Sequence, residues 1–260
     1  MVVEQSIQVA WTYSGRQLRS LEIPPASAEI MPGVVWGCAT ELFTPAFWKY
    51  QSAGFQLRVD RNSFRLGNTI TEELAVCLLG GFGMPAELGL AAFHRLRDRS
   101  LLAAEVRQEE IERALSEPFH IGNRQRRYRF PKQKARYLWH ALQMTGALPE
   151  APRQLRDFLV RLPGIGPKTA SWVVRNHYAC DEVAILDVHI LRAGVAMGLF
   201  LPGADPARDY FKLEARFLQF CGAIGEPASL VDSLMWDYMR RIGPTAINRT
   251  HVQRETVCVQ

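Results

Sequence analysis

Residues Leu162–Val174, LPGIGPKTASWVV, place a lysine directly after two glycines and two prolines that interrupt an otherwise helical stretch. Gly164 and Gly166 permit a positive φ and leave backbone N–H groups uncovered, and Pro167 suits the first turn of a second helix. Exposed N–H groups at a helix N-terminus form an anion site that fits one phosphate. Lys168 stands in that turn, where the partial positive charge of the helix end disfavours an ammonium and makes the amine available as a nucleophile.

The elements that must position this lysine are two helices joined by a tight turn, LRDFLVRL and PKTASWVVRN, forming a hairpin over residues 157–176. A hairpin of this kind contacts phosphates mainly through main-chain amides, so it holds a nucleic-acid backbone without reading its sequence. Taken alone, the hairpin is equally typical of the passive DNA-binding modules of ligases, helicases and nucleases.

The pattern L-P-G-x-G-x-K-T-A resembles the helix–hairpin–helix of the DNA glycosylase superfamily, which removes damaged or modified bases. In this superfamily an essential aspartate follows the hairpin at the end of a short loop. Asp187 lies 19 residues after Lys168 in LDVHI, which is similar to the V-D-x-H form of the 8-oxoguanine glycosylases. The resemblance implies that Lys168 attacks C1′ of the deoxyribose and forms a Schiff base, as in members that also cleave the strand. It also implies that Asp187 stabilises the oxocarbenium-like charge on the sugar.

A base inside a duplex must be flipped out before this chemistry, and the resemblance implies which residues then read it. Asp232 and Trp236 lie four apart in LVDSLMWDYMRR, hence on one helix face, where the archaeal-type 8-oxoguanine glycosylases present an acid and an aromatic. Asp232 would accept hydrogen bonds from N1–H and N2–H₂ of a guanine, and Trp236 would stack on its face. Trp172 is either a second stacking plane or a core residue. The alternatives are a capping or surface-paired acid for Asp232 and a plain core aromatic for Trp236.

Two further contacts with DNA follow from the same resemblance. His189 would contact the substrate phosphate, unless it is a structural residue at a helix start. The loop LLGGFGMPAEL resembles the loop from which relatives insert a wedge into the helix gap, so Phe82 and Met84 are the wedge candidates, with packing as their alternative. The loop is not Asn-rich, and Glu87 stands where an arginine that reads an opposite cytosine is expected, so the opposite-base preference stays open.

The distribution of charge favours an anionic partner. The net charge is +5, with a pI of about 9.1. The stretch His120–His140 holds seven Arg and Lys, no acid, and four interleaved aromatics. Surfaces that grip a phosphate backbone have this character; a solvated basic helix face is the alternative.

The rest of the chain predicts a mostly α-helical protein. Residues 1–66 are the least helical, with strand-like SIQVAWTY and FQLRVDRNSFRL around loop-like EIPPASAEIMPGVVWG. From Thr69 onward, periodic apolar positions, a Thr cap and terminal glycines predict successive helices, the last ending at the glycine of MRRIG. With the resemblance, we expect a two-lobed helical glycosylase fold divided into an N-terminal irregular or β-containing portion (1–66), a helical core (67–241) and a C-terminal tail (242–260).

The cysteines predict no metal or iron–sulfur cofactor. Five are scattered without a close pair, and only Cys258 lies near the C-terminus, where relatives of the endonuclease III branch carry four cluster ligands. We see no signal peptide and no apolar run near the roughly 20 residues that cross a bilayer. We therefore expect a cytoplasmic, nucleoid-associated monomer with no membrane partner.

Together, the residues and the resemblance imply a bifunctional DNA glycosylase/AP lyase that acts on 8-oxoguanine in duplex DNA. Two alternatives stay open. One is a glycosylase of the same superfamily for another modified base, such as an oxidised pyrimidine or a modified base in foreign DNA. The other is a DNA-binding module with a dead active site.

Overall fold

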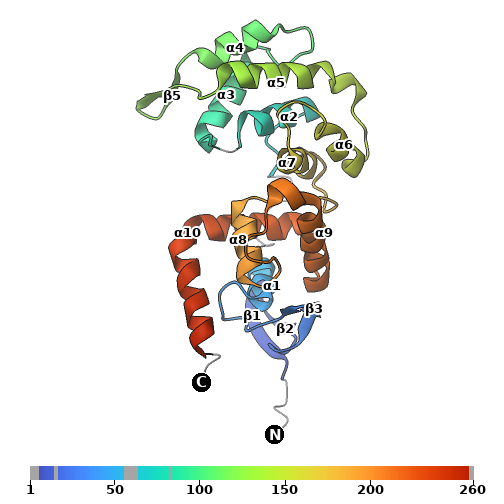
Figure 1. Cartoon of the computed structure of the whole chain (residues 1–260), viewed down its shortest axis with the longest axis vertical. Helices are drawn as coiled ribbons and strands as arrows, with labels where there is room; N and C mark the ends of the chain where they lie inside the picture. The colour runs from blue at the N-terminus through green and yellow to red at the C-terminus, as the bar shows by residue number, and fades with distance from the viewer. Residues whose placement is uncertain (1–5, 15–16, 56–63, 82, 258–260) are drawn as a thin grey trace. The chain divides into compact units, whose positions relative to one another are not determined.

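The computed structural model describes residues 6–14, 17–55, 64–81 and 83–257, and these are mostly helical (Figure 1). The chain divides into two compact units. Unit 1 combines residues 1–61 with 184–260, and unit 2 comprises residues 62–183. The mostly α-helical fold class is therefore confirmed.

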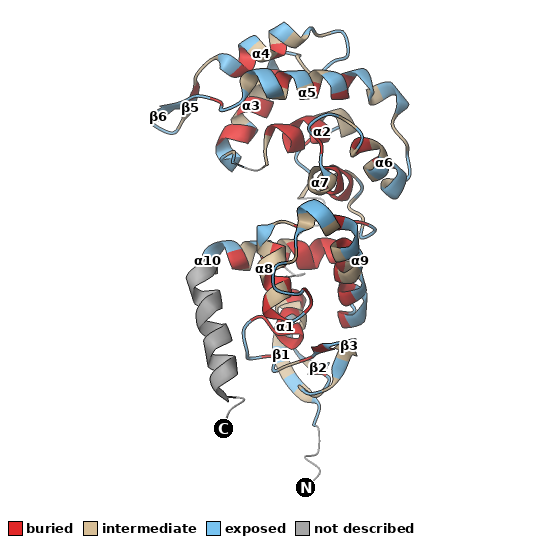
Figure 2. Cartoon of the chain, in the orientation of Figure 1, coloured by how far each residue is buried: buried red, intermediate tan, exposed pale blue. Residues whose placement is uncertain are grey.

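Unit 2 carries the helix–hairpin–helix and a small antiparallel hairpin of strands. Its elements are α2 (Ile70–Leu79), α3 (Ala86–Asp98), α4 (Gln108–Ser116), β5 (Phe119–Ile121), β6 (Arg124–Arg126), α5 (Pro131–Gln143), the 3-10 turn η2 (Thr145–Ala147), α6 (Pro152–Leu159) and α7 (Pro167–Tyr178). α2 is buried along nearly its whole length (Figure 2), because α3, α5 and α7 pack around it. Thr69 caps α2 by accepting a hydrogen bond from the Glu72 amide at 3.2 Å, as the sequence predicts.

Unit 1 packs helices over two small β-hairpins. Its elements are β1 (Gln8–Ser14), β2 (Gln17–Ile23), β3 (Glu29–Met31), β4 (Val34–Val35), α1 (Pro45–Phe55), α8 (Val188–Ala196), α9 (Pro206–Ile224) and α10 (Ala228–Val257). β1 and β2 pair antiparallel from Gln8↔Ile23 to Ser14↔Gln17. Trp48, Phe217 and Phe220 are among the largest side chains of its core.

The N-terminal portion differs from the expectation in two respects. The strand predicted in SIQVAWTY is present as β1, but the stretch read as a loop contains β3 and β4. The helix α1 was not predicted; Thr44 starts it by accepting a hydrogen bond from the Phe47 amide at 3.0 Å. Most of FQLRVDRNSFRL lies outside the described residues.

The helical portion differs in its boundaries. Residues 86–117 have helical periodicity throughout, but they form two helices, because the chain turns between them at Ser100 with φ +56°. α10 does not end at Gly243 but continues through Pro244 to Val257. The helix penalties of these residues, about 1 kcal/mol for glycine and about 3 kcal/mol for proline, weaken a helix without forbidding it. The units also cut across the expected 1–66, 67–241 and 242–260 divisions, because residues 184–260 group with the N-terminal residues in unit 1.

Candidate active site

The turn between α6 and α7 has the predicted hairpin form, with different roles for its two glycines. Gly164 has φ +79°, and a Cβ at this position would lie 2.0 Å from Cδ2 of Tyr137 on α5. It is therefore required both by the backbone conformation and by the close approach of an aromatic ring. Gly166 does not have the expected positive φ: at φ −87° and ψ 172° it is the N-cap of α7 in ordinary extended backbone.

The N-terminus of α7 offers open amides. The N-cap Gly166 supplies no capping side chain, and a Cβ there would meet nothing within 4 Å. The first amide bonded to the cap residue is that of Ala170, at 3.0 Å from the Gly166 carbonyl oxygen. The amides of Lys168 and Thr169 have no acceptor among the described residues. Such a helix start is suited to hold one phosphate.

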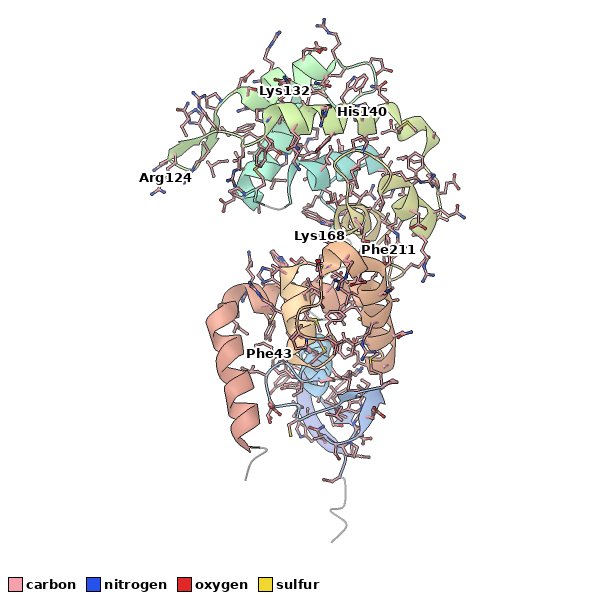
Figure 3. The ribbon with its side chains drawn as sticks, in the orientation of Figure 1. Phe43, Arg124, Lys132, His140, Lys168 and Phe211 are labelled. Carbon is pink, nitrogen blue, oxygen red and sulfur yellow. The ribbon has the colours of Figure 1, made fainter. Side chains whose placement is uncertain are left out.

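Lys168 occupies the first turn of α7 (Figure 3), after Pro167 at its first position. Its side chain is half-buried and makes no ion pair with a described residue; its Nζ lies 5.9 Å from the ring centroid of Trp172, one turn along the same helix. Trp172 is itself half-buried, packs on the unit 2 core, and lies beside Gly80 at the end of α2. The structure thus places Trp172 in packing contacts, and its role as a stacking plane stays a prediction.

The predicted wedge loop follows α2. Met84 is half-buried and packs on the unit 2 core, whereas Phe82 lies outside the described residues. The loop begins where two side chains bind the end of α2: the Tyr128 hydroxyl donates to the Leu79 carbonyl and Nζ of Lys134 to the Leu78 carbonyl, both at 2.5 Å. Burial raises the pKa of Tyr128 and lowers the pKa of Lys134. The loop therefore has a firmly held start, and the wedge role of its residues stays a prediction.

In unit 1, Asp187 is the N-cap of α8. Its Oδ1 accepts hydrogen bonds from the amides of His189 at 2.8 Å and Ile190 at 3.1 Å. Its Oδ2 has no hydrogen-bond partner among the described residues. The cap thus fixes the carboxylate through one oxygen and leaves the other available.

The segment preceding Asp187 is held by side chains that the sequence reading did not connect with it. The Ala184 amide donates to Oε1 of the buried Glu214 at 3.0 Å. The Tyr210 hydroxyl donates a hydrogen bond to the Ala184 carbonyl at 2.8 Å and accepts one from the Leu186 amide at 3.2 Å. These contacts join residues 24 to 30 positions apart, so no local pattern indicates them.

Asp232 contacts the same segment. It is 1% exposed, and its Oδ2 lies 3.3 Å from the Ile185 amide, while its Oδ1 lies 3.1 Å from the Ser233 hydroxyl. Sequence reasoning placed it on a helix face for base recognition; the structure places it as a support of the segment that leads to Asp187. Its role in reading a base stays a prediction.

Trp236, one turn further along α10, is 41% exposed and therefore not a plain core aromatic. The Arg240 guanidinium lies 4.4 Å from its ring centroid, and the His189 ring meets it edge-to-face at 6.5 Å. Nδ1 of His189 is buried without a hydrogen-bond partner among the described residues. Unit 1 thus brings Asp187, His189 and Trp236 into one neighbourhood, and Arg240 is a member that sequence reasoning missed, although its i+4 spacing from Trp236 could have indicated it.

Among the described residues there is no group of three or more His, Cys, Asp or Glu placed to hold a metal ion. Cys258 lies outside them. No helix among the described residues combines the length and the apolar character needed to span a membrane.

Comparison with known proteins shows the family of the chain. The family described as 8-oxoguanine DNA glycosylase, of helix–hairpin–helix type, matches residues 59–226. An 8-oxoguanine DNA glycosylase/AP lyase of Metallosphaera sedula is 34% identical over 116 residues, which are 42% of this chain and 57% of the relative. The aligned part thus spans little more than half of that relative's length.

Two solved structures are similar in fold. The 8-oxoguanine DNA glycosylase of Thermotoga maritima is 29% identical with a TM-score of 0.52, over 64% of this chain and 77% of that chain. The 8-oxoguanine DNA glycosylase of Methanocaldococcus jannaschii is 24% identical with a TM-score of 0.51, over 74% and 84% of the two chains, a likeness of fold alone. Because the family match covers more than half of its residues, the chain belongs to the helix–hairpin–helix family of 8-oxoguanine DNA glycosylases.

Proposed function

We propose that this protein is a bifunctional DNA glycosylase/AP lyase that excises 8-oxoguanine from duplex DNA. The observation that carries the proposal is Lys168 in the first turn of α7, beside open helix-start amides, in a chain of this family. Membership also supports the substrate class, since the Metallosphaera sedula relative is named for both activities. We expect the chain to work on double-stranded DNA as a cytoplasmic, nucleoid-associated monomer without an iron–sulfur cluster.

In the proposed reaction, the unprotonated amine of Lys168 attacks C1′ of the flipped nucleotide. The C1′–N9 bond breaks, its electron pair leaves with the base, and the base takes up a proton. The negative charge of Asp187 stabilises the oxocarbenium-like sugar during this step. Ring opening gives a Schiff base between Nζ and C1′; loss of a proton from C2′ then breaks the C3′–O bond and cleaves the strand. Water finally hydrolyses the Schiff base and restores the amine.

The remaining residues have proposed roles in binding. Trp236 would stack on the flipped base, Asp232 would accept its N–H groups, and His189 would contact the phosphate beside it. Trp172 is a second stacking candidate. Gly164 and Gly166 keep the hairpin amides open for the backbone, and Met84 or Phe82 would fill the gap left in the helix.

Borohydride trapping tests the proposal. Duplexes that carry 8-oxoguanine, oxidised pyrimidines, other modified bases or an abasic site are incubated with the protein and reduced. We expect a covalent adduct with 8-oxoguanine and with the abasic site, and none with Lys168→Gln, which should still bind DNA. If no lesion gives an adduct, or if Lys168→Gln still cleaves, the Schiff-base assignment is wrong. Faster trapping on another lesion would name a different substrate.

Paired substitutions at Asp187 separate its charge from its cap. Asparagine is as good an N-cap as aspartate and loses only the attraction between the charge and the helix start, about 0.3–1 kcal/mol. Asp187→Asn should therefore lose less than about 1 kcal/mol of stability, while excision falls by at least about a hundredfold, a typical loss for a transition-state electrostatic contact. Asp187→Ala should lose the same activity and, in addition, about 0.5–2 kcal/mol of stability. Full activity in Asp187→Asn would remove the carboxylate from the mechanism.

The role of Asp232 is tested by comparing two substrates. If it reads the base, Asp232→Ala weakens 8-oxoguanine excision far more than cleavage at a pre-formed abasic site. Equal losses on both would remove it from base recognition and leave only its support of the segment before Asp187.

A further inference from the structure

The β5–β6 hairpin gathers arginines on one face. Its register pairs Phe119 with Arg126 and Ile121 with Arg124, and directly opposed residues of an antiparallel pair project to the same side. Arg124 and Arg126 therefore share a face with two apolar residues, whereas His120 and Gln125 form the other pair. Figure 3 shows Arg124 at the far end of the hairpin, away from the helices of unit 2.

This hairpin is anchored at its base. Phe119 is buried, and the Arg95 guanidinium lies 3.5 Å from its ring centroid. Arg95 also donates hydrogen bonds to the carbonyls of Ala114, Glu117 and Pro118 at 2.7–2.9 Å. After β6, the hydroxyl of buried Tyr128 donates a hydrogen bond to the Leu79 carbonyl at the end of α2. The arginines therefore stand on a fixed support, so ordering them on a ligand loses less conformational entropy than ordering a free loop.

A cavity of about 770 Å³ lies between the hairpin and the loop before α3. Met84 of the loop and Glu87 of the first turn of α3 line it on one side, and Arg124, Arg126, Arg127 and Arg129 line it on the hairpin side. Four guanidinium groups thus face one carboxylate. Arg129 lies 3.5 Å from the Gly83 carbonyl. The side chains of Arg124, Arg126 and Arg127 are exposed, and their guanidinium groups make no hydrogen bond or ion pair with any described residue.

Other arginines of unit 2 differ in this respect. Arg95 is engaged by three carbonyls, Arg99 forms a 2.6 Å ion pair with Glu117, and Arg107 lies 3.2 Å from Glu110. A cluster of like charges repels itself, and no acid from the neighbouring elements other than Glu87 lines the cavity. An open cavity with several unpaired guanidinium groups is suited to anionic oxygens, which Arg binds in bidentate fashion.

We propose that the arginine face of the β5–β6 hairpin is a second phosphate-binding surface, distinct from the helix–hairpin–helix, which holds the backbone of the DNA duplex next to the Met84 loop. The inference rests on the proposed function for the identity of its partner. A duplex fits better than a single small anion, because the arginines extend from the tip of a strand pair to the loop and the cavity is open. Arg124 and Arg126, two residues apart in one strand, are separated by roughly 6.6 Å, so they contact different phosphates.

The same surface is linked to the loop that carries the wedge candidate. Arg129 reaches Gly83, while Tyr128 and Lys134 bind the carbonyls at the end of α2 from which the loop starts. Backbone phosphates bound by the hairpin would therefore lie beside Met84. This arrangement gives unit 2 two separate contacts with DNA, one through main-chain amides and one through arginine side chains.

The test is a triple variant, Arg124→Gln/Arg126→Gln/Arg127→Gln, compared with wild type and with Arg99→Gln/Arg107→Gln/Arg113→Gln. The control also removes three positive charges from unit 2, but at residues outside the cavity lining. Binding to an undamaged duplex is measured from 50 to 300 mM salt. We expect the hairpin variant to bind on the order of tenfold more weakly at low salt. The slope of log K against log salt should become shallower by about 0.9 for each phosphate that the variant no longer neutralises.

The control should keep the wild-type slope to within about 0.9, the value of a single phosphate. The melting temperature of the hairpin variant should match wild type, because the three side chains it replaces are exposed. An unaltered slope, or equal losses in both triple variants, would overturn the inference, as would weakened binding to an acidic peptide or single-stranded RNA with duplex binding intact. If wild type excises no lesion but the hairpin variant still lowers the duplex slope, the proposed function fails and this inference stands.

Discussion

Replacing Gly164 by alanine should destabilise the hairpin by two separable effects. A left-handed backbone costs a non-glycine residue about 1–2 kcal/mol, and Gly164 has φ +79°. The added Cβ would also lie 2.0–2.5 Å from three ring carbons of Tyr137, so the ring or the hairpin must move, and overpacking of this kind costs about 1–3 kcal/mol. We expect a total loss of about 2–5 kcal/mol, which lowers the melting temperature by at least about 5 °C.

Thermal unfolding followed by circular dichroism measures this loss, and Gly166→Ala is its matched control. Gly166 has a negative φ and open space around its Cβ position. Gly166→Ala should therefore lose less than about 1 kcal/mol of stability. This small loss arises because alanine is a poorer N-cap residue than glycine. The two substituted positions lie only two residues apart. A large difference in stability between the variants therefore reports the local backbone conformation and the Tyr137 contact.

A double-mutant cycle with Tyr137→Ala separates the clash from the backbone strain. In the Tyr137→Ala background the Gly164→Ala substitution should cost about 1–3 kcal/mol less, because the ring is gone and only the positive φ remains. The reasoning is refuted if Gly164→Ala melts like wild type, if Gly166→Ala is equally destabilised, or if the cycle shows no coupling.

Three further predictions concern stability. Glu73→Gln should lose about 1–3 kcal/mol of stability in urea unfolding, because this buried carboxylate accepts hydrogen bonds from two backbone amides and the Asn176 side chain. A glutamine amide would turn a donor toward one of these donors. An unchanged urea midpoint would contradict this reasoning. Arg95→Lys should lower the melting temperature, since an ammonium cannot cover the Phe119 ring while bonding three carbonyls; a neutral result would remove Arg95 as the hairpin anchor. Burial and the charge of Arg65 lower the pKa of His177 below its ordinary value of 6.5. The unfolded chain therefore binds more protons than the folded chain below pH 6.5, and stability falls as the pH falls. Melting temperatures measured from pH 7.5 to 5 should decline less in His177→Gln than in wild type, and parallel curves would exclude the effect.

The features that sequence could predict are those set by neighbouring residues. The Thr69 cap, Pro167 at the start of α7 and the positive φ of Gly164 all follow from local backbone chemistry. Asp187 was identified by family resemblance, and its capping of α8 is again a local contact. Such features need no knowledge of the fold, and they include the lysine and aspartate of the proposed site.

The features that sequence could not predict depend on tertiary packing. The side chains of Glu214, Tyr210 and Asp232 reach residues 184–186 across 24 to 47 positions of chain. The helix α1 lies in the portion that the sequence predicts to be least helical, and it is stabilised by the packing of Phe47 and Trp48 in the unit 1 core. The arginines of residues 120–129 are visible as a basic run, but only the register of β5 and β6 places Arg124 and Arg126 on one face.

The geometry of Asp187 suits the role proposed for its charge. An N-cap is satisfied by Ser, Thr or Asn as well as by Asp, so the two amide contacts of its Oδ1 do not by themselves require a charge. The helix start of α8 stabilises that charge by about 0.3–1 kcal/mol, and the supports from α9 and α10 fix the backbone before it. The cap therefore holds a negative charge in a set orientation with Oδ2 available, which is what electrostatic stabilisation of a cationic sugar requires, because a carboxylate already oriented loses little energy to reorganisation during the reaction.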